Sequence, residues 1–134
     1  MQKIEHIGIA VDDLEKSNIL FSKIFGKKMF KSETIESEGV VTSFFEIGDS
    51  KIELVAATNS NSPIAKYLQK NRSGIHHLAF DVNDIKKEMN RLKREVIRLL
   101  IEVPKQGADN KLICFLHPKD TNNVLIELCQ EIKK

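Results

Sequence analysis

The chain has 134 residues, a length that suits one compact domain or two small modules that share a core. Charged residues make up 30% of the sequence but leave a formal net charge of +2, and basic residues are interleaved with acidic ones, which disfavours a nucleic-acid-binding protein. The lack of Trp disfavours a base-stacking surface, and no apolar run approaches the ~18 residues that cross a bilayer, so neither nucleic acid nor a membrane is an expected partner.

Residues 1–58 carry the pattern of a β-α-β-β-β module. Residues 3–11 alternate as a strand does, and residues 12–26 repeat apolar side chains at helical spacing. Asp12 is the expected N-cap of this helix, and Gly26 is the residue expected to end it. The remaining strands of the module are expected at residues 27–35, 40–48 and 50–57, with Gly48-Asp49 as the hairpin turn between the last two.

Residues 62–72 predict a linker helix, with Ser62 as its N-cap and Pro63 as its first helical residue. The β-α-β-β-β pattern then returns in residues 74–131. The expected fold class is therefore α+β, with two tandem βαβββ modules in a single domain, residues 1–134, whose sheets pair around a shared interior. In the second module, strands are expected at residues 74–82, 96–103, 111–117 and 123–130, and a helix with Ile85, Met89 and Leu92 on one face is expected at residues 83–95.

Two cysteines, Cys114 and Cys129, lie in apolar, alternating stretches and are not spaced as a CxxC pair. They are interpreted as two buried thiols rather than as a disulfide or a thiolate pair, because cytosolic thiols are usually reduced. The sequence reaches Glu5 before any long apolar stretch begins, so no signal peptide is expected. The expected compartment is the cytoplasm.

The two modules share a sequence motif. His6 begins H-I-G-I-A-V-D-D-L and His77 begins H-L-A-F-D-V-N-D-I, so a histidine, aliphatic residues and an acidic or amide pair recur in the same order. The last strands of the modules also align, with Glu53 inside K-I-E-L-V-A and Glu127 inside L-I-E-L-C-Q. Each module thus offers one histidine on its first strand and one glutamate within an apolar last strand.

This recurring set predicts a site for one divalent metal ion. A buried carboxylate is costly without a cation, a proton or a metal, and imidazoles combined with carboxylates suit Zn, Co, Ni, Fe or Mn. A lone strand histidine is more often a hydrogen-bonded core residue, and a lone glutamate can point to solvent. The recurrence of both residue types at equivalent positions favours the metal interpretation, with His6, Glu53, His77 and Glu127 as the ligands.

The other two histidines lie outside this set. His76 points to the opposite face of its strand from His77 and aligns with Glu5 in the repeat, so it is interpreted as structural. His117 ends a strand before Pro118 and has no counterpart in the first module. It is expected either to contact a substrate or to stabilise the turn.

On these residues the chain resembles the methylmalonyl-CoA epimerase family of the vicinal oxygen chelate superfamily, whose members pair βαβββ modules around a divalent metal. The resemblance spans nearly the whole chain. The HPKD stretch and the SPIAKYLQKN linker are more specific than the metal ligands, which glyoxalase I also has. The segments that carry the resemblance are HIGIAVDDLEKS, KIELVAATNSNSPIAKYLQKNRSGIHHLAFDV, EVPKQGADNKLICFLHPKD and VLIELCQ.

Two positions depart from the family pattern. Some members carry a Glu, proposed as the catalytic base, where this chain has Thr42, and those members have Gln where this chain has Glu53. Compared with those members, this chain therefore has its carboxylate at position 53 instead of position 42. The usual glycine-rich turn before the last strand is Thr121-Asn122-Asn123 here, and because Asn tolerates left-handed backbone the turn is expected to persist.

The resemblance implies that the chain interconverts (R)- and (S)-methylmalonyl-CoA by removing and returning the α-proton through an enolate. It also implies one divalent ion as Lewis acid, with Co²⁺ expected and Zn²⁺, Ni²⁺ or Mn²⁺ as alternatives. Inversion needs an acid and a base on opposite faces, and Glu53 and Glu127 are the candidates. A homodimer is the expected assembly. The candidates for contact with the CoA portion of the substrate are Lys105, Lys119, Arg98 and His117.

Two alternative functions remain open from the sequence. Glyoxalase I has the same four ligand types but acts on a glutathione hemithioacetal. A non-catalytic small-molecule-binding protein of the same fold, such as a drug-sequestering resistance protein, commonly lacks the full ligand set. Retention of all four residues counts against that second alternative.

Overall fold

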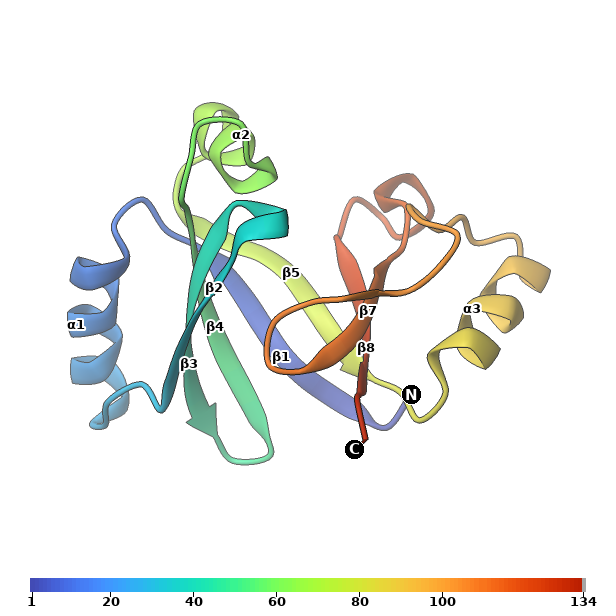
Figure 1. The fold of residues 1–134 in the computed structure, drawn as a ribbon, viewed down its shortest axis with the longest axis horizontal. Coiled ribbons are helices and arrows are strands. Elements are labelled where there is room, and N and C mark those ends of the chain that lie inside the picture. The colour runs from blue at the N-terminus through green and yellow to red at the C-terminus, as the bar shows by residue number, and fades with distance from the viewer. Residues whose placement is uncertain (134) are drawn as a thin grey trace. The chain divides into compact units, whose positions relative to one another are not determined.

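The computed structural model describes residues 1–133 of the chain, and its elements confirm the expected α+β class (Figure 1). The helices are α1 (Leu14–Phe25), α2 (Pro63–Lys70) and α3 (Ile85–Arg94), with short 3-10 helices at Glu36–Glu38 and Pro118–Asp120. The strands are β1 (Lys3–Ala10), β2 (Lys31–Ile35), β3 (Val40–Ile47), β4 (Ser50–Ala57), β5 (Gly74–Asp81), β6 (Lys105–Gln106), β7 (Lys111–Phe115) and β8 (Ile126–Glu131).

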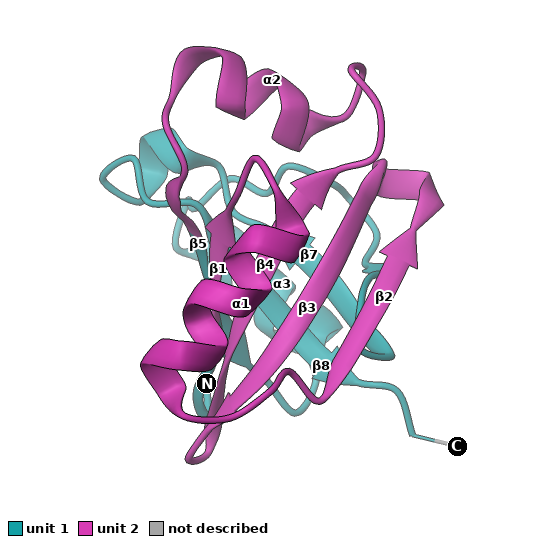
Figure 2. Cartoon of the chain, turned by 90° about the vertical axis from the view of Figure 1, so that its left-hand side faces the viewer, with its two compact units in different colours: residues 1–6, 77–134 teal, residues 7–76 magenta. Residues whose placement is uncertain are grey.

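The strands are hydrogen-bonded in the order β2-β3-β4-β1-β5-β8-β7-β6. β3 is antiparallel to both β2 and β4, whereas β8 is parallel to β5 and antiparallel to β7. The chain divides into two compact units, coloured separately in Figure 2. Unit 1 comprises Met1–His6 and His77–Lys134, and unit 2 comprises Ile7–His76.

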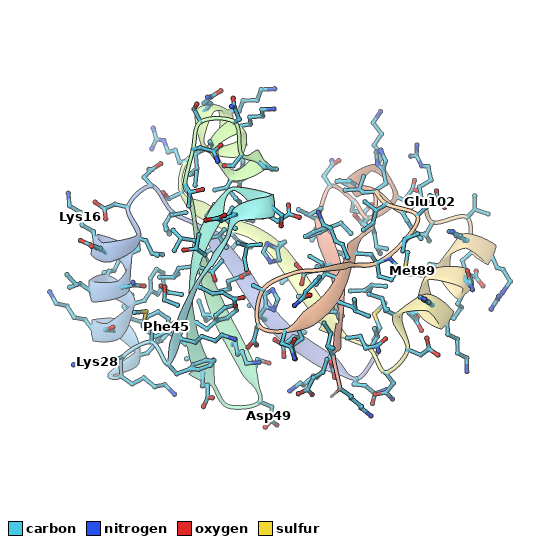
Figure 3. The ribbon with its side chains drawn as sticks, viewed as in Figure 1. Lys16, Lys28, Phe45, Asp49, Met89 and Glu102 are labelled. Atoms are coloured by element: carbon cyan, nitrogen blue, oxygen red, sulfur yellow. The ribbon has the colours of Figure 1, made fainter. Side chains whose placement is uncertain are left out.

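In unit 2, α1 packs its aromatic residues against β3. The rings of Phe25 and Phe45 lie 5.4 Å apart in an edge-to-face arrangement, and Figure 3 shows Phe45 between α1 and β3. Leu54 of β4 joins the same buried cluster. Because side chains alternate along a strand, Thr42 and Glu53 lie on the other face of the β3–β4 hairpin, away from α1.

The start of α1 differs by one residue from the expectation. Asp13, not Asp12, is the N-cap, since its side chain accepts a hydrogen bond from the backbone N–H of Lys16 at 3.1 Å. A cap must sit directly before the first helical residue, which is Leu14, for its side chain to reach that donor. The carboxylate of Asp12 instead accepts a hydrogen bond from the Ser73 hydroxyl at 3.2 Å.

Other local predictions are confirmed. Gly26 ends α1 in a left-handed conformation, with φ of 68°. Ser62 caps α2 by accepting a hydrogen bond from the N–H of Ala65 at 3.1 Å, and Pro63 is the first residue of that helix. Asn122 and Asn123 both adopt the left-handed backbone, with φ of 54° and 66°. None of the described helices is long and apolar enough to cross a membrane.

In unit 1, α3 covers one face of the sheet. Ile85, Met89 and Leu92 are buried along one side of the helix, as the sequence pattern predicted, and they pack with Cys114 and Leu128. Figure 3 shows Met89 on the side of α3 that faces the strands. The hydrophobic surface of this helix therefore decides which face of β7 and β8 is turned toward it.

The predicted strand at residues 96–103 is wrong. Val96 has a φ of 62°, which lies outside the strand region. The backbone N–H of Arg98 donates to the carboxylate of Asp120 at 2.9 Å, so this donor is not available to a neighbouring strand. Strand-like pairing is limited to one isolated bridge at Leu99. The apolar residues of the segment do contribute side chains to the cluster beneath α3, which explains the misleading pattern.

The two cysteines are free and buried, as predicted. Cys114 lies in the cluster beneath α3, whereas Cys129 packs with Ala79 and Ile113 on the opposite face of the sheet. Burial raises the pKa of the Cys114 thiol to about 11 and raises the pKa of Cys129 further still, helped by the nearby carboxylate of Glu127. Both thiols are therefore protonated and chemically inert near neutral pH.

Replacement of Gly39 by alanine is predicted to destabilise the protein more than the same replacement at Gly26. Both glycines have positive φ, 64° and 68°, so each alanine meets the left-handed penalty of roughly 1–2 kcal/mol. Only at Gly39 would the new Cβ also collide, lying 2.7 Å from Cβ of Ser62, whereas nothing lies within 4 Å at Gly26. Urea unfolding should show Gly39→Ala to be at least ~1 kcal/mol worse than Gly26→Ala. Equal losses would contradict the predicted clash.

Candidate metal centre

Three side chains of unit 1 converge at one point: His6 of β1, His77 of β5 and Glu127 of β8. The two Nε2 atoms of the histidines lie 3.1 Å apart. One carboxylate oxygen of Glu127 lies 3.7 Å from Nε2 of His6, and the other lies 3.6 Å from Nε2 of His77. All three residues are buried, with 5–6% of each exposed. The potential ligand atoms of the three side chains all lie within 4.8 Å of one another.

Strand pairing explains why His77 and Glu127 meet. β5 and β8 are parallel, and their register places Ala79 beside Glu127. His77 precedes Ala79 by two residues and therefore projects from the same face of the sheet. On the other side of β8, the register places Phe115 of β7 beside Glu127, and the Phe115 ring lies 6.1 Å from the His77 ring.

The surroundings of the cluster are apolar. Ala79, Ile113 and Cys129 form a small buried cluster on this face, and Phe115 packs against it. Such a wall keeps water away from the polar group and lowers the local dielectric, which strengthens any electrostatic interaction there. The sheet of unit 1 thus has an apolar face beneath α3 and, opposite, a face with a polar cluster beside an apolar wall.

The residues of the cluster fit a divalent metal ion. A carboxylate buried beside two imidazoles is a donor set that Zn, Co, Ni, Fe and Mn accept. Two ligand atoms held about 2.1 Å from one ion would be about 3.0 Å apart at the right angle of an octahedral site and about 3.4 Å apart at the tetrahedral angle. The contacts within the cluster, 3.1, 3.6 and 3.7 Å, are of this size. The donor chemistry and the spacing therefore agree.

Glu53, the fourth expected ligand, belongs to unit 2. It lies in β4, is 6% exposed and is paired in register with Phe44 of β3. Thr42, at one of the two positions that depart from the expected family pattern, is 1% exposed, and its hydroxyl donates to the backbone carbonyl of Glu33 at 3.3 Å. The hydroxyl of Thr42 is thus engaged with the neighbouring strand β2.

Arg98, a candidate for contact with CoA, forms a three-point interaction with Asp120. The guanidinium donates from Nε to Oδ2 at 2.9 Å and from a terminal nitrogen to Oδ1 at 3.0 Å, and the backbone N–H of Arg98 donates to Oδ2. Arg98 lowers the pKa of the Asp120 carboxyl to about 2. The positive charge of Arg98 is therefore already balanced within the protein.

The remaining candidates lie at the surface or in a turn. Lys105 and Lys119 are exposed. His117 stabilises the turn that follows β7, because its Nδ1 accepts a hydrogen bond from the backbone N–H of Lys119 at 3.2 Å. His76 lies in unit 2, where its ring meets the ring of Tyr67 edge-to-face at 4.8 Å, in keeping with the structural role expected for it.

Two features of the site were missed from the sequence. Glu5 was aligned with His76 in the repeat and given no role, yet it is 2% exposed and its Oε1 lies 3.4 Å from Nδ1 of His6. The partnership of Asp120 with Arg98 was also missed. The only available signal for the latter was an acidic residue inside the HPKD stretch, and for Glu5 the alternation of the strand gave no signal at all.

Comparisons with known proteins agree with this architecture. Residues 5–115 match the family described as Glyoxalase/Bleomycin resistance protein/Dioxygenase superfamily. The mitochondrial methylmalonyl-CoA epimerase of Homo sapiens is 40% identical over 129 residues, which cover 96% of this chain and 73% of that protein. The ethylmalonyl-CoA/methylmalonyl-CoA epimerase of Cereibacter sphaeroides is 38% identical over 130 residues, which cover 96% of this chain and 97% of that protein.

A solved structure also resembles this chain over nearly its whole length. A variant of Streptomyces coelicolor methylmalonyl-CoA epimerase in complex with 2-nitronate-propionyl-CoA superposes with a TM-score of 0.94 and 33% sequence identity. The superposition covers 98% of this chain and 95% of that chain. Similarity in sequence and in structure therefore extends over nearly the entire molecule.

The Asp120–Arg98 pair is predicted to make stability depend on pH in the acidic range. The pKa of Asp120 is lower in the folded chain than the usual 3.8, so its contribution is present above about pH 4 and is lost as the pH falls through about 2. Urea unfolding should therefore show Asp120→Asn to be less stable than wild type at pH 6 but equal to it near pH 2. In an Arg98→Gln background the pH dependence of the same replacement should be clearly smaller, because the guanidinium is removed and only the backbone N–H of residue 98 still bonds this carboxylate. A pH dependence of undiminished size there would contradict the assignment.

Proposed function

The chain belongs to the methylmalonyl-CoA epimerase family of the Glyoxalase/Bleomycin resistance protein/Dioxygenase superfamily, and on this premise we propose that it interconverts (R)- and (S)-methylmalonyl-CoA. The observation that carries the proposal is the buried convergence of His6, His77 and Glu127 within a fold shared with these epimerases. Glyoxalase I is not favoured, because the relatives reported above are named as epimerases of acyl-CoA compounds.

The chemistry explains why such a cluster is needed. The α-carbon of methylmalonyl-CoA lies between a thioester and a carboxylate, and its proton is too weakly acidic for a free glutamate to remove at neutral pH. A divalent ion held by His6, His77 and Glu127, with Glu53 as the proposed fourth ligand, would supply the Lewis acidity that stabilises the enolate. Co²⁺ is the ion we propose first, with Zn²⁺, Ni²⁺ and Mn²⁺ as alternatives.

The chain's own residues must then move the proton. Inversion at the α-carbon needs one group that accepts the proton on one face of the planar enolate and another that returns it on the opposite face. Glu53 and Glu127 are proposed for these two roles, since both are buried carboxylates at equivalent positions of the repeat. Thr42 cannot act as a base at neutral pH, and its hydroxyl is already bonded to the backbone of β2.

The wall beside the cluster has a second proposed role. Ala79, Ile113 and Phe115 present no polar side chain to the reacting carbon, so an enolate held against them would be protected from protons of bulk water. Return of the proton is then left to the positioned carboxylates. This protection favours inversion over uncontrolled exchange.

The CoA phosphates require cations, and Lys105, Lys119, Arg98 and His117 remain the proposed contacts. Lys119 suits this role better than Arg98, because Lys119 is exposed and the charge of Arg98 is balanced by Asp120. The turn that includes His117 and Lys119 is held by its own hydrogen bonds, so it can present Lys119 without a large loss of conformational freedom.

The proposed activity is predicted to appear as exchange of the α-proton. Protein loaded with Co²⁺ and incubated with methylmalonyl-CoA in deuterated water should introduce deuterium at the α-carbon, and it should not convert methylglyoxal with glutathione. His77→Ala should lower the exchange rate at least about 10³-fold, equivalent to ~4 kcal/mol of transition-state stabilisation. His76→Ala is the matched control and should remain close to wild type. Turnover of methylglyoxal with glutathione, or no exchange by the metal-loaded wild type, would contradict the proposal.

The two-base arrangement is tested by Glu53→Gln, which keeps an oxygen ligand but removes a proton acceptor. Racemisation should nearly stop, because one face of the enolate then lacks its acid or base. Deuterium should still enter one enantiomer, whose proton faces Glu127 and is returned from the same side. The measurement is deuterium incorporation into separately supplied (R) and (S) substrates, with the bound metal quantified in parallel. Equal, near wild-type exchange in both enantiomers would show that Glu53 has no role in the mechanism. Absence of exchange in both, with the metal retained, would mean that Glu53 tunes the metal or positions the substrate instead of moving the proton.

A further inference from the structure

We infer that Glu5 is a positioning residue for His6: its buried carboxylate accepts the Nδ1–H of this histidine and thereby directs the Nε2 lone pair into the cluster with His77 and Glu127. The consequence of this arrangement for metal binding rests on the function proposed above. The tautomer that Glu5 imposes does not, because it is a property of the metal-free chain.

The contacts of His6 separate its two ring nitrogens. Nδ1 lies 3.4 Å from Oε1 of Glu5, whereas Nε2 lies 3.1 Å from Nε2 of His77 and 3.7 Å from Oε2 of Glu127. The side chains of Glu5 and His6 are 3% and 7% exposed, so water competes little for either group. Each nitrogen therefore has its own environment, and only Nε2 faces the candidate metal centre.

The protonation of one ring nitrogen decides what the other can do. A neutral imidazole carries a single N–H, and the nitrogen without it offers the lone pair that a metal needs. A carboxylate is acceptor-only, so its proximity favours the proton on Nδ1 and a lone pair on Nε2. In the metal-free chain this tautomer also satisfies the short contact to His77, in which His77 Nε2–H donates to His6 Nε2.

The repeat makes Glu5 a distinguishing feature of the first module. The position equivalent to Glu5 in the second module is occupied by His76, which belongs to unit 2 and meets Tyr67. A carboxylate in this position therefore precedes only one of the two histidines. Because a carboxylate partner raises the basicity of an imidazole ligand, Glu5 should make His6 a more strongly donating ligand than His6 would be without it.

The first experiment begins with the wild-type chain. Nitrogen-15 correlation spectra of the metal-free wild-type protein should show His6 with a protonated Nδ1 and an unprotonated Nε2. In Glu5→Leu this preference should weaken, whereas Glu5→Gln should retain it, because the amide oxygen can accept the same hydrogen bond. A proton found on Nε2 of His6 in the wild type would overturn the inference directly.

The second experiment measures the affinity for Zn²⁺ by calorimetric titration. Glu5→Leu should lower the affinity at least about 10-fold, and Glu5→Gln should restore it to within about threefold of the wild type. Met89→Ala is the matched control for general loss of stability. Met89 lies on the buried side of α3, which packs on the opposite face of the sheet from the candidate metal centre, so its replacement should leave the affinity unchanged.

The outcomes separate the inference from the proposed function. Unchanged Zn²⁺ affinity in Glu5→Leu, or an equal loss in Met89→Ala, would overturn the positioning role. If the wild type binds no divalent ion while His6 still shows the Nδ1–H tautomer, the inference about Glu5 stands and the proposed metal centre fails. The two experiments therefore distinguish a failure of the positioning role of Glu5 from a failure of the proposed metal centre.

Discussion

The parallel pairing of β5 with β8 is the constraint on which the candidate metal centre depends. The register sets Ala79 beside Glu127, and the alternation of side chains then brings His77 to the same face. A slip of one residue would turn Glu127 toward α3 and place Leu128 where the polar cluster now lies. The packing of Leu128 beneath α3 prevents such a slip, because it would remove Leu128 from that cluster and bury a carboxylate among apolar neighbours. The hydrophobic core on one face of unit 1 thus holds in place the chemistry on the other.

Unit 2 applies the same rule to the β3–β4 hairpin. Phe45 and Leu54 are drawn under α1, and the alternation along each strand leaves Thr42 and Glu53 on the face away from that helix. The position of Glu53 therefore follows from an apolar contact that Glu53 does not itself make. In both units, helix burial sets the orientation of a strand and the strand then presents the carboxylate. Substitutions on the apolar face and on the polar face of these strands can therefore be made independently, as long as the strand-pairing register is kept.

The sequence predicted the features that depend on local pattern. Alternation and helical spacing located most elements. The recurrence of histidine and glutamate singled out His6, Glu53, His77 and Glu127, and three of these four side chains, His6, His77 and Glu127, lie together in unit 1. The errors arose where long-range contacts decide the outcome. The segment at residues 96–103 has the composition of a strand, but Asp120 takes a backbone donor that a strand would need. Strand alternation alone would turn Glu5 and its neighbour His6 to opposite faces, yet the Glu5 side chain is long enough to reach the His6 ring. Neither contact can be read from spacing along the chain.

The boundary between the two units falls at the two histidines themselves. The first segment of unit 1 ends at His6 and the second begins at His77, so unit 2 is one continuous segment of the chain between these two residues. The ring nitrogens of His6 and His77 are in contact. In polymer terms, that contact closes a loop, and the entropy of closing a loop grows only with the logarithm of its length, by about 0.6 kcal/mol for each doubling. Insertions in the turns of unit 2 should consequently be tolerated with little effect on the pairing of the two rings. Members of the family are therefore expected to differ in length within the segment that corresponds to unit 2 more readily than next to the two histidines that flank it.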